Sequence, residues 1–443
     1  KKLAGQTLWY GVPTIASRFL GYLMNLSLPL FFAQPATTAD LTQIYAIIPF
    51  LNVLFTYGLE TAYFRFSKEE DPHKLYSTLS IALLGSTFLF TGILCLSSVM
   101  VNLITVLLFI GWIPYKVQQD PNTWLTVFTN NNIGIGYYLI GNLAGSILTF
   151  LLLFNEFRKI SMQFSIPLFK KVMEYSYPLI IVGMGGMVND MLSRLIYQHV
   201  VQLPVDEAKH ELGIFGNIYR LAVLITILIQ AFRMAAEPFF FKQKGEENAQ
   251  KIYARVMKFF VITCCFMFLF ISLFIEVFGW FFMAIDKPLW AQGLQVVPLL
   301  ALGNIFLGVY YNLSIWYKLT DKNNYGAMIT IAGALITIGL NIVLIPSLHY
   351  LGAALATFLC YTFMMLVSYY MGQQYYPVPY ATKKLSAYLV IVLAMYGLQK
   401  TILYFFPHLW LGIIIGFICI GLFTWLVIWA EQKELSKFFR KAN

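Results

Sequence analysis

Charged residues are scarce in this chain of 443 residues. Asp, Glu, Lys and Arg together make up 11% of it, whereas an ordinary soluble domain carries about 25%. Hydrophobic residues make up 59%, and the mean hydropathy is +0.71. No segment has the length and polarity of a separate soluble domain. The composition excludes a soluble fold and predicts an all-α polytopic membrane protein.

Cysteine and histidine are also few. The five cysteines all lie in apolar segments, and no two of the five histidines have the spacing of metal ligands. Neither a disulfide framework nor a metal site is therefore expected. The sequence also lacks a glycine-rich phosphate loop followed by its lysine, which excludes a built-in ATPase. We expect no cofactor and no enzymatic activity, so an ion gradient, the membrane potential or mass action must supply the energy.

Long apolar runs are what the chain has instead. A membrane-spanning helix needs about 20 apolar residues. The expected spans are 4–32, 41–66, 75–98, 132–155, 174–200, 211–236, 251–283, 293–317, 325–346, 351–372, 384–406 and 408–430.

The basic residues between these runs are unevenly distributed. If the spans alternate, 22 of the 30 Lys and Arg residues lie on the side of the N-terminus and four on the other. Short cytoplasmic loops carry an excess of Lys and Arg, so both termini are predicted to be cytoplasmic. The net charge of +10 follows from this topology, and no nucleic-acid partner is expected.

The alternation fails in one place. Residues 75–114 form an apolar run of about 40 residues, and a single helix of that length would be about twice the hydrocarbon thickness. Two crossings would place every later basic loop on the wrong side. We infer that one to two spans are missing near residues 98–101 and that the intact protein has about 14.

Four arginines lie within expected spans, where a charge at the helix centre costs about 2.5–3.5 kcal/mol. One of them, Arg194, belongs to the apolar stretch 177–200 and shares a helix face with Asp190, four residues earlier. A glycine-rich segment at 183–186 permits either close helix approach or a local break. A spanning helix with one polar face predicts a polar interior. The other three arginines are Arg18, Arg220 and Arg233.

Three motifs resemble a known family. They are GLETAYFR at 58–65, QAFRMAAEP at 230–238 and YYNLSIWYKLTD at 310–321. They are similar to the polysaccharide-flippase branch of the multidrug/oligosaccharidyl-lipid/polysaccharide exporter superfamily, in the form of the O-antigen flippases of Bacteroidetes. The resemblance covers nearly the whole chain and departs from the family only at the shortened region near 98–101.

The resemblance implies two six-helix lobes related by a pseudo-twofold axis along the membrane normal, plus two C-terminal helices. It also implies alternating access around a cationic cavity in a bacterial inner membrane. The cargo would be a polyprenyl-pyrophosphate-linked oligosaccharide, turned from the cytoplasmic to the outer leaflet among the membrane lipids. The expected parts are an N-terminal lobe 1–155, a cytoplasmic interfacial linker 156–171, a C-terminal lobe 172–373, a transmembrane hairpin 384–431 and a basic cytoplasmic tail 432–443.

A diphosphate head group suggests which residues bind the cargo. Guanidinium groups bind phosphates through bidentate hydrogen bonds, and arginines at several depths suit a head group that crosses the membrane. The expected substrate-binding residues are Arg18, Asn25, Asn52, Asp190, Arg194, Arg220 and Arg233. Glu60 and Glu237 are expected candidates for a coupling monovalent cation or proton.

Each charge also has a structural alternative, in which it serves only to neutralise a neighbour. The pairs in question are Asp190–Arg194, Asp190–Arg220, Arg233–Glu237 and Glu60–Arg65. Arg18 has no carboxylate within a helical turn, so a structural pairing explains it least well.

Two other functions stay open. A cation-coupled multidrug antiporter of the same superfamily would favour acidic residues over arginines in its cavity. A membrane glycosyltransferase or polymerase that uses a polyprenyl-linked donor needs acid and base residues in an outer loop. The longest outer loop expected here, 115–131, has Asp120 as its only carboxylate.

Overall fold

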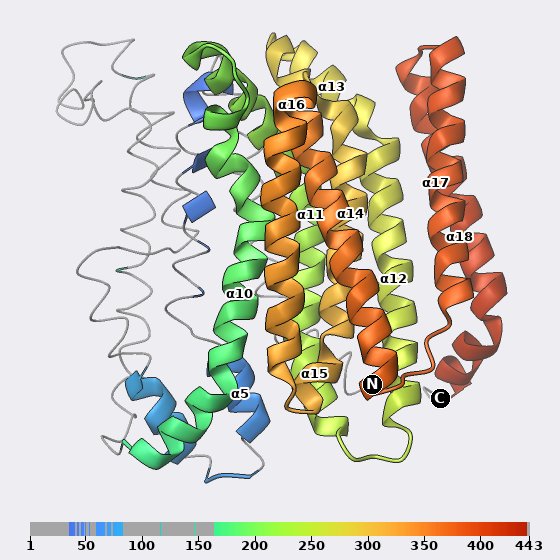
Figure 1. Cartoon of the computed structure of the whole chain (residues 1–443). Helices are drawn as coiled ribbons and strands as arrows, with labels where there is room; N and C mark the ends of the chain where they lie inside the picture. Colours follow the sequence, from blue (N-terminus) through green and yellow to red (C-terminus); the bar gives the residue numbers. More distant parts are fainter. Residues whose placement is uncertain are drawn as a thin grey trace.

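The protein is described by a computed structural model, which places residues 164–440 continuously, together with parts of 35–82 and residues 116 and 147. Throughout these residues the regular structure is helical, with no strand (Figure 1). The α-helices are α5 (Leu59–Phe66), α10 (Ile166–Val200), α11 (Val205–Gln243), α12 (Ala249–Leu273), α13 (Ile275–Ala284), α14 (Val297–Leu313), α15 (Ile315–Leu319), α16 (Asn323–Tyr375), α17 (Thr382–Phe405) and α18 (Leu409–Arg440). Three 3-10 turns join them: η2 (Pro35–Thr38), η5 (Pro288–Ala291) and η6 (Leu294–Val296).

Seven helical stretches of the described part are long and apolar enough to cross a membrane. One of them, α16, consists of two arms, because His349 has φ 54° and ψ −134° and so interrupts the helix. Figure 1 shows the two arms running in opposite directions. The eight spans expected from residue 174 onward are therefore present, and the prediction of an all-α multi-pass membrane protein is confirmed. The expected spans before residue 164 and the predicted break near 98–101 lie wholly or largely outside the described residues.

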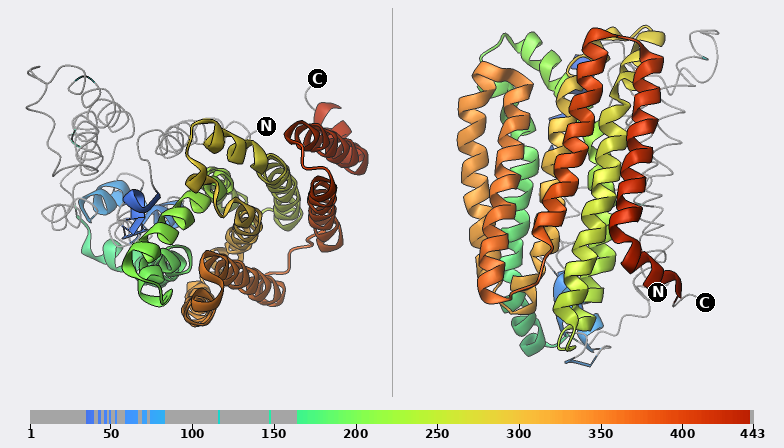
Figure 2. Two further views of the ribbon diagram at one scale, coloured as in Figure 1. Left: turned by 90° about the horizontal axis from the view of Figure 1, so that it is seen from above. Right: turned by 90° about the vertical axis from the view of Figure 1, so that its right-hand side faces the viewer.

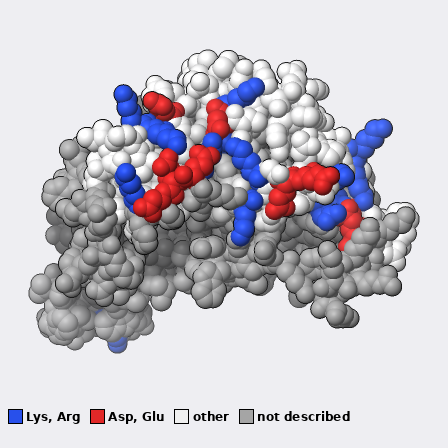
Figure 3. Space-filling model, turned by 90° about the horizontal axis from the view of Figure 1, so that it is seen from below, with Lys and Arg blue, Asp and Glu red and all other residues white. Residues whose placement is uncertain are grey.

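The connections predicted to share one side of the membrane do lie at one end of the bundle. Residues 243–249, 319–323 and 376–382 join the helices at the lower end in Figure 1. We call this the basic end. Seen from below, its Lys and Arg side chains lie next to Asp and Glu side chains across the described surface (Figure 3). Ion pairing therefore balances much of the charge at this end, and which side of the membrane it faces stays a prediction.

Helix α10 passes through the glycine-rich segment without a break. A side chain at Gly185 would come within 3.0–3.2 Å of Thr330, including its backbone. Small residues of this kind let two helices of a membrane protein approach closely. The first arm of α16 uses this space to pack on α10, and α16 also packs on α14. Of the two alternatives, close approach is the one observed.

Helices α17 and α18 stand to one side of the bundle and pack on α12 (Figure 2). Their attachment at the basic end is polar. The Glu431 carboxylate of α18 is 1% exposed and lies 2.7 Å from both Lys258 of α12 and Lys384 of α17. Tyr388 of α17 donates a further hydrogen bond of 2.7 Å to the same carboxylate.

Candidate functional site

A cavity of about 190 Å³ lies where helices α10, α11, α14, α15 and α16 meet the described part of the N-terminal half of the chain. Val53 and Thr61 line it from the N-terminal half. Gly186 lines it, and a Cβ atom there would meet no described atom within 4 Å. The charged residues of the described lining are Arg233, Glu237 and Lys318. The other described lining residues are uncharged.

Glu237 is the centre of this polar group. Its Oε1 atom accepts hydrogen bonds from Lys318 Nζ at 2.7 Å and from Thr61 Oγ1 at 2.9 Å. Arg233 lies one helical turn earlier on α11, attracts Glu237 electrostatically and holds its guanidinium 5.1 Å from the centre of the Tyr311 ring. The side chains of Glu237 and Lys318 are only 13% and 12% exposed. The Glu237 carboxylate thus interacts with two cations and also binds the other half of the chain.

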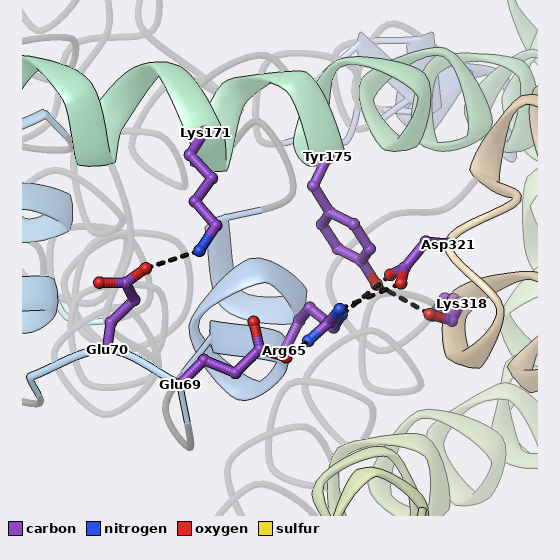
Figure 4. Close-up of polar contacts among 7 residues, drawn as sticks. All are labelled: Arg65, Glu69, Glu70, Lys171, Tyr175, Lys318 and Asp321. Carbon is purple, nitrogen blue, oxygen red and sulfur yellow. Dashed lines mark hydrogen bonds and ion pairs between the residues drawn. The ribbon is translucent and has the colours of Figure 1, made fainter.

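Polar contacts join α5 to the C-terminal half of the chain at the basic end (Figure 4). Arg65 of α5 donates from Nε to Asp321 Oδ1 at 2.9 Å and from Nη2 to Asp321 Oδ2 at 3.0 Å. Arg65 also pairs with Glu69, one turn later. Since two parallel hydrogen bonds fix both the distance and the orientation of the partners, this contact connects α5 firmly to the turn between α15 and α16.

Three further contacts at this end involve α10, one with the N-terminal half and two with α15 and α16. Lys171 pairs with Glu70 at 2.6 Å (Figure 4). The Tyr175 hydroxyl donates to the Lys318 carbonyl at 3.4 Å, and Asn323 Nδ2 donates to the Tyr175 carbonyl at 3.2 Å. At the opposite end, α11 also approaches the N-terminal half closely, because a side chain at Gly213 would meet the carbonyl of Pro35. The described part of the N-terminal half therefore contacts α10 at the basic end and α11 at the opposite end.

Asp190 and Arg194 form a separate polar cluster on α10. The nearest atoms of the pair, Asp190 Oδ1 and Arg194 Nη2, are 4.0 Å apart. The Arg194 guanidinium lies 3.9 Å from the centre of the Tyr219 ring, and the Tyr361 hydroxyl donates to Asp190 Oδ1 at 3.4 Å. Neither Asp190 nor Arg194 is among the residues that line the cavity.

The residues predicted to bind substrate are thus only partly brought together. Arg233 and the coupling candidate Glu237 lie in one cavity, whereas Asp190 and Arg194 contact each other beside it. Arg220, on α11, does not line the cavity. Arg18, Asn25 and Asn52 lie outside the described residues, as does the side chain of Glu60. The Arg65 guanidinium, considered above as a partner of Glu60, binds Asp321 and Glu69.

Sequence reasoning missed three residues of the site. Lys318 and Asp321 lie in the motif at 310–321 and Thr61 in the motif at 58–65, but the sequence predicts a binding role for none of the three. The signal for the first two was available, because Lys318 and Asp321 occupy one conspicuous motif with several aromatic residues. Their partners, Glu237 and Arg65, are 81 and 256 positions away.

Comparison with known proteins identifies the fold. No protein-family model and no curated protein matches the chain. A crystal structure of a MATE mutant matches with a TM-score of 0.53 and 11% identity, over 88% of this chain and 97% of that one. Lipid II flippase MurJ, in an inward closed conformation, matches with a TM-score of 0.50 and 13% identity, over 96% of this chain and 91% of that one. At such low identity the likeness shows the fold alone, so the superfamily that the motifs resemble and the branch within it both stay predictions.

Proposed function

We propose that the protein is a flippase that carries a polyprenyl-pyrophosphate-linked oligosaccharide from the cytoplasmic to the outer leaflet of a bacterial inner membrane, for polysaccharide or O-antigen synthesis. The observation that supports this is the charge of the cavity between the two halves of the chain. Among the described lining residues, Arg233 and Lys318 are cations and Glu237 is the carboxylate, so cations outnumber carboxylates in this part of the wall. A diphosphate is attracted to such a surplus in a partly dry interior, where charges are weakly screened.

Transport would require the two halves of the chain to move relative to each other. The described N-terminal half is joined to the C-terminal half at the basic end by the Arg65–Asp321 pair and by the Thr61–Glu237 hydrogen bond. Breaking these contacts would let the halves separate there and expose the cavity to one leaflet. Alternating access follows if the halves then close at this end and separate at the other. Of the residues predicted from sequence, Arg233 carries this proposal, and the roles of the others stay predictions.

Reconstitution tests the proposal directly. Purified protein in liposomes is given a fluorescent polyprenyl-pyrophosphate-linked oligosaccharide, and a membrane-impermeant quencher reports which leaflet holds the label. We expect wild-type protein to equilibrate the label between leaflets and Lys318→Gln to do so much more slowly. Lys251→Gln removes one charge from an exposed position of α12 and serves as the matched control. The proposed function is contradicted if liposomes with wild-type protein transfer the label no faster than liposomes without protein.

The orientation belongs to the same proposal, with the basic end and both termini in the cytoplasm. Two cysteine variants test it, Lys244→Cys at the basic end and Glu207→Cys at the opposite end. Both residues are exposed. A thiol reagent added outside intact spheroplasts should label the Glu207 variant and spare the Lys244 variant. Labelling of the Lys244 variant overturns the orientation.

A cation-coupled antiporter is the second candidate, and one observation favours it. Asp190 is a carboxylate in the middle of α10, with Tyr361 and Arg194 as neighbours. In the same liposomes, an imposed sodium or proton gradient that drives uptake of a cationic dye, together with no lipid transfer, selects the antiporter.

A further inference from the structure

Glu237 has the position and the contacts of an anionic ligand. Its Oε1 atom is bound by the ammonium group of Lys318 at 2.7 Å and by the hydroxyl of Thr61 at 2.9 Å. The guanidinium-bearing residue Arg233 shares its helix face one turn away. An ammonium, a hydroxyl and a nearby guanidinium are the donors that also bind a phosphate oxygen. The carboxylate therefore fills a site suited to a phosphate.

The same carboxylate connects the two halves of the chain. Thr61 belongs to α5 of the N-terminal half, and Glu237 and Lys318 belong to α11 and α15. Thr61 and Lys318 donate to the same atom of Glu237, Oε1, so the position of this one atom determines both contacts. If Glu237 is displaced from Lys318, the link between the halves at this point is lost as well.

We propose that Glu237 is a built-in substitute for the substrate anion. In the empty protein it occupies the phosphate site made by Lys318, Arg233 and Thr61 and holds the basic end closed. An arriving diphosphate group displaces it and so releases α5 from α11. The inference rests on the proposed function in one respect, that the substrate carries a diphosphate. It adds the residue that makes anion binding and opening of the basic end mutually dependent.

Linkage gives the proposal two consequences. A ligand shifts a conformational equilibrium only if it binds one state more tightly, and the shift is reciprocal. Removing the competing carboxylate should therefore strengthen anion binding and also open the basic end without any anion. A simple structural ion pair has only the first consequence, because an unpaired Lys318 attracts anions without any movement of the halves.

The experiment measures both quantities with inorganic pyrophosphate as the probe. Affinity is measured on purified full-length protein by titration. Opening is measured as the distance between spin labels at exposed Lys74 in the N-terminal half and exposed Lys244 after α11. Wild-type protein should show a longer distance when pyrophosphate is added. Glu237→Gln should bind pyrophosphate about tenfold more tightly, which corresponds to about 1.4 kcal/mol, and should show the longer distance without it.

Two further variants make the result decisive. Glu211→Gln removes a partly buried carboxylate from the same helix, at the other end, where Tyr197 and His349 bind it. It should leave affinity and distance unchanged. Thr61→Val retains every charge and removes only the bond between the halves, so it should lengthen the distance even if Glu237→Gln folds poorly.

The inference is overturned if Glu237→Gln binds pyrophosphate more tightly but keeps the wild-type distance. It is also overturned if the variant binds no more tightly than Glu211→Gln, or if Thr61→Val stays closed. The lipid-transfer assay is independent of these readouts. If the wild type transfers lipid and the variants give any of these results, the inference fails and the proposed function stands. If the wild type does not transfer the lipid but pyrophosphate opens the basic end, the inference stands and the substrate is a different diphosphate.

Discussion

The Arg65 guanidinium and the Asp321 carboxylate are 256 positions apart in the chain and form two parallel hydrogen bonds of 2.9 and 3.0 Å. Asp321 has a positive φ of 58°, a left-handed conformation that aspartate tolerates better than most residues. The tight turn between α15 and α16 thus holds the carboxylate opposite α5. This pair lies at the basic end, next to the cavity, and both of its partners come from motifs that resemble the flippase family.

Breaking this pair should increase access to the cavity from the basic end. A partly exposed pair is worth about 0.2–1 kcal/mol, so Arg65→Gln should raise the accessibility of the cavity by up to about fivefold. The rate at which an impermeant thiol reagent labels Met234→Cys, a cavity-lining position, measures it. Lys170→Gln removes a charge from an exposed site at the same end and should have no effect. Asp321→Asn, which suits the same left-handed conformation, removes the other partner and should raise the labelling rate in the same way if the interaction itself is the cause.

Filling the cavity should stop transport without unfolding the protein. A Cβ atom at Gly186 would meet no described atom within 4 Å, and Gly186 lines the cavity. We expect Gly186→Leu to keep the wild-type melting temperature and to lose most lipid transfer. Gly339→Leu is the matched control, since Gly339 on α16 is exposed and also has nothing within 4 Å. Equal transfer by the two variants would mean that the substrate does not pass this part of α10.

The spans were predictable from the sequence because each is a local property of about 20 consecutive residues. The described helices from α10 to α18 agree with the eight predicted spans, although the first arm of α16 and the second are joined at His349 without a loop. The concentration of basic residues at one end was also predictable, since it depends only on the alternation of successive spans across the membrane. The identity of ion-pair partners was not, because Glu237 and Lys318 meet only through the packing of α11 against α15.

The glycine-rich segment shows the same limit. Its three glycines are equally compatible with close approach of a second helix and with a break in α10. Only the packing of α16 on α10 decides between the two. Asp190 and Arg194 share a helix face, as their spacing requires. That they lie 4.0 Å apart, with Arg194 stacked on Tyr219, depends on the neighbouring helix α11.

The C-terminal hairpin should depend on Glu431. This carboxylate is 1% exposed and binds Lys258 and Lys384, so it joins α18 to both α12 and α17. Glu431→Gln should lower the free energy of unfolding by roughly 1–3 kcal/mol because it leaves cationic donors poorly satisfied. Thermal unfolding in detergent measures the loss, and protease cleavage in residues 376–381 should become faster. Glu434→Gln, at a position with 36% side-chain exposure that also contacts Lys258, should cost clearly less.

The Asp190–Arg194 pair offers a test between a structural and a substrate-binding role. Arg194 is 8% exposed, and its Nε atom has no hydrogen-bond partner among the described residues. Its charge is therefore compensated mainly by Asp190, through the carboxylate at 4.0 Å and the backbone carbonyl, which accepts from Nη2 at 3.2 Å. The Tyr219 ring adds a cation–π contact.

Replacing Asp190 by Asn keeps the backbone carbonyl and the side-chain size but removes the charge. Because a buried charge then loses part of its compensation, we expect Asp190→Asn to lower the free energy of unfolding by roughly 1–3 kcal/mol. Because neither residue lines the cavity, the affinity for pyrophosphate should stay within about twofold of the wild type, well below the tenfold change that about 1.4 kcal/mol produces. Thermal unfolding and pyrophosphate titration on the same preparation measure both. Tighter pyrophosphate binding by Asp190→Asn with unchanged stability would instead show that Asp190 holds Arg194 back from a second anion site. The two roles thus predict different results. Loss of a structural carboxylate changes the stability of the protein alone, whereas loss of a competing carboxylate changes its affinity for pyrophosphate.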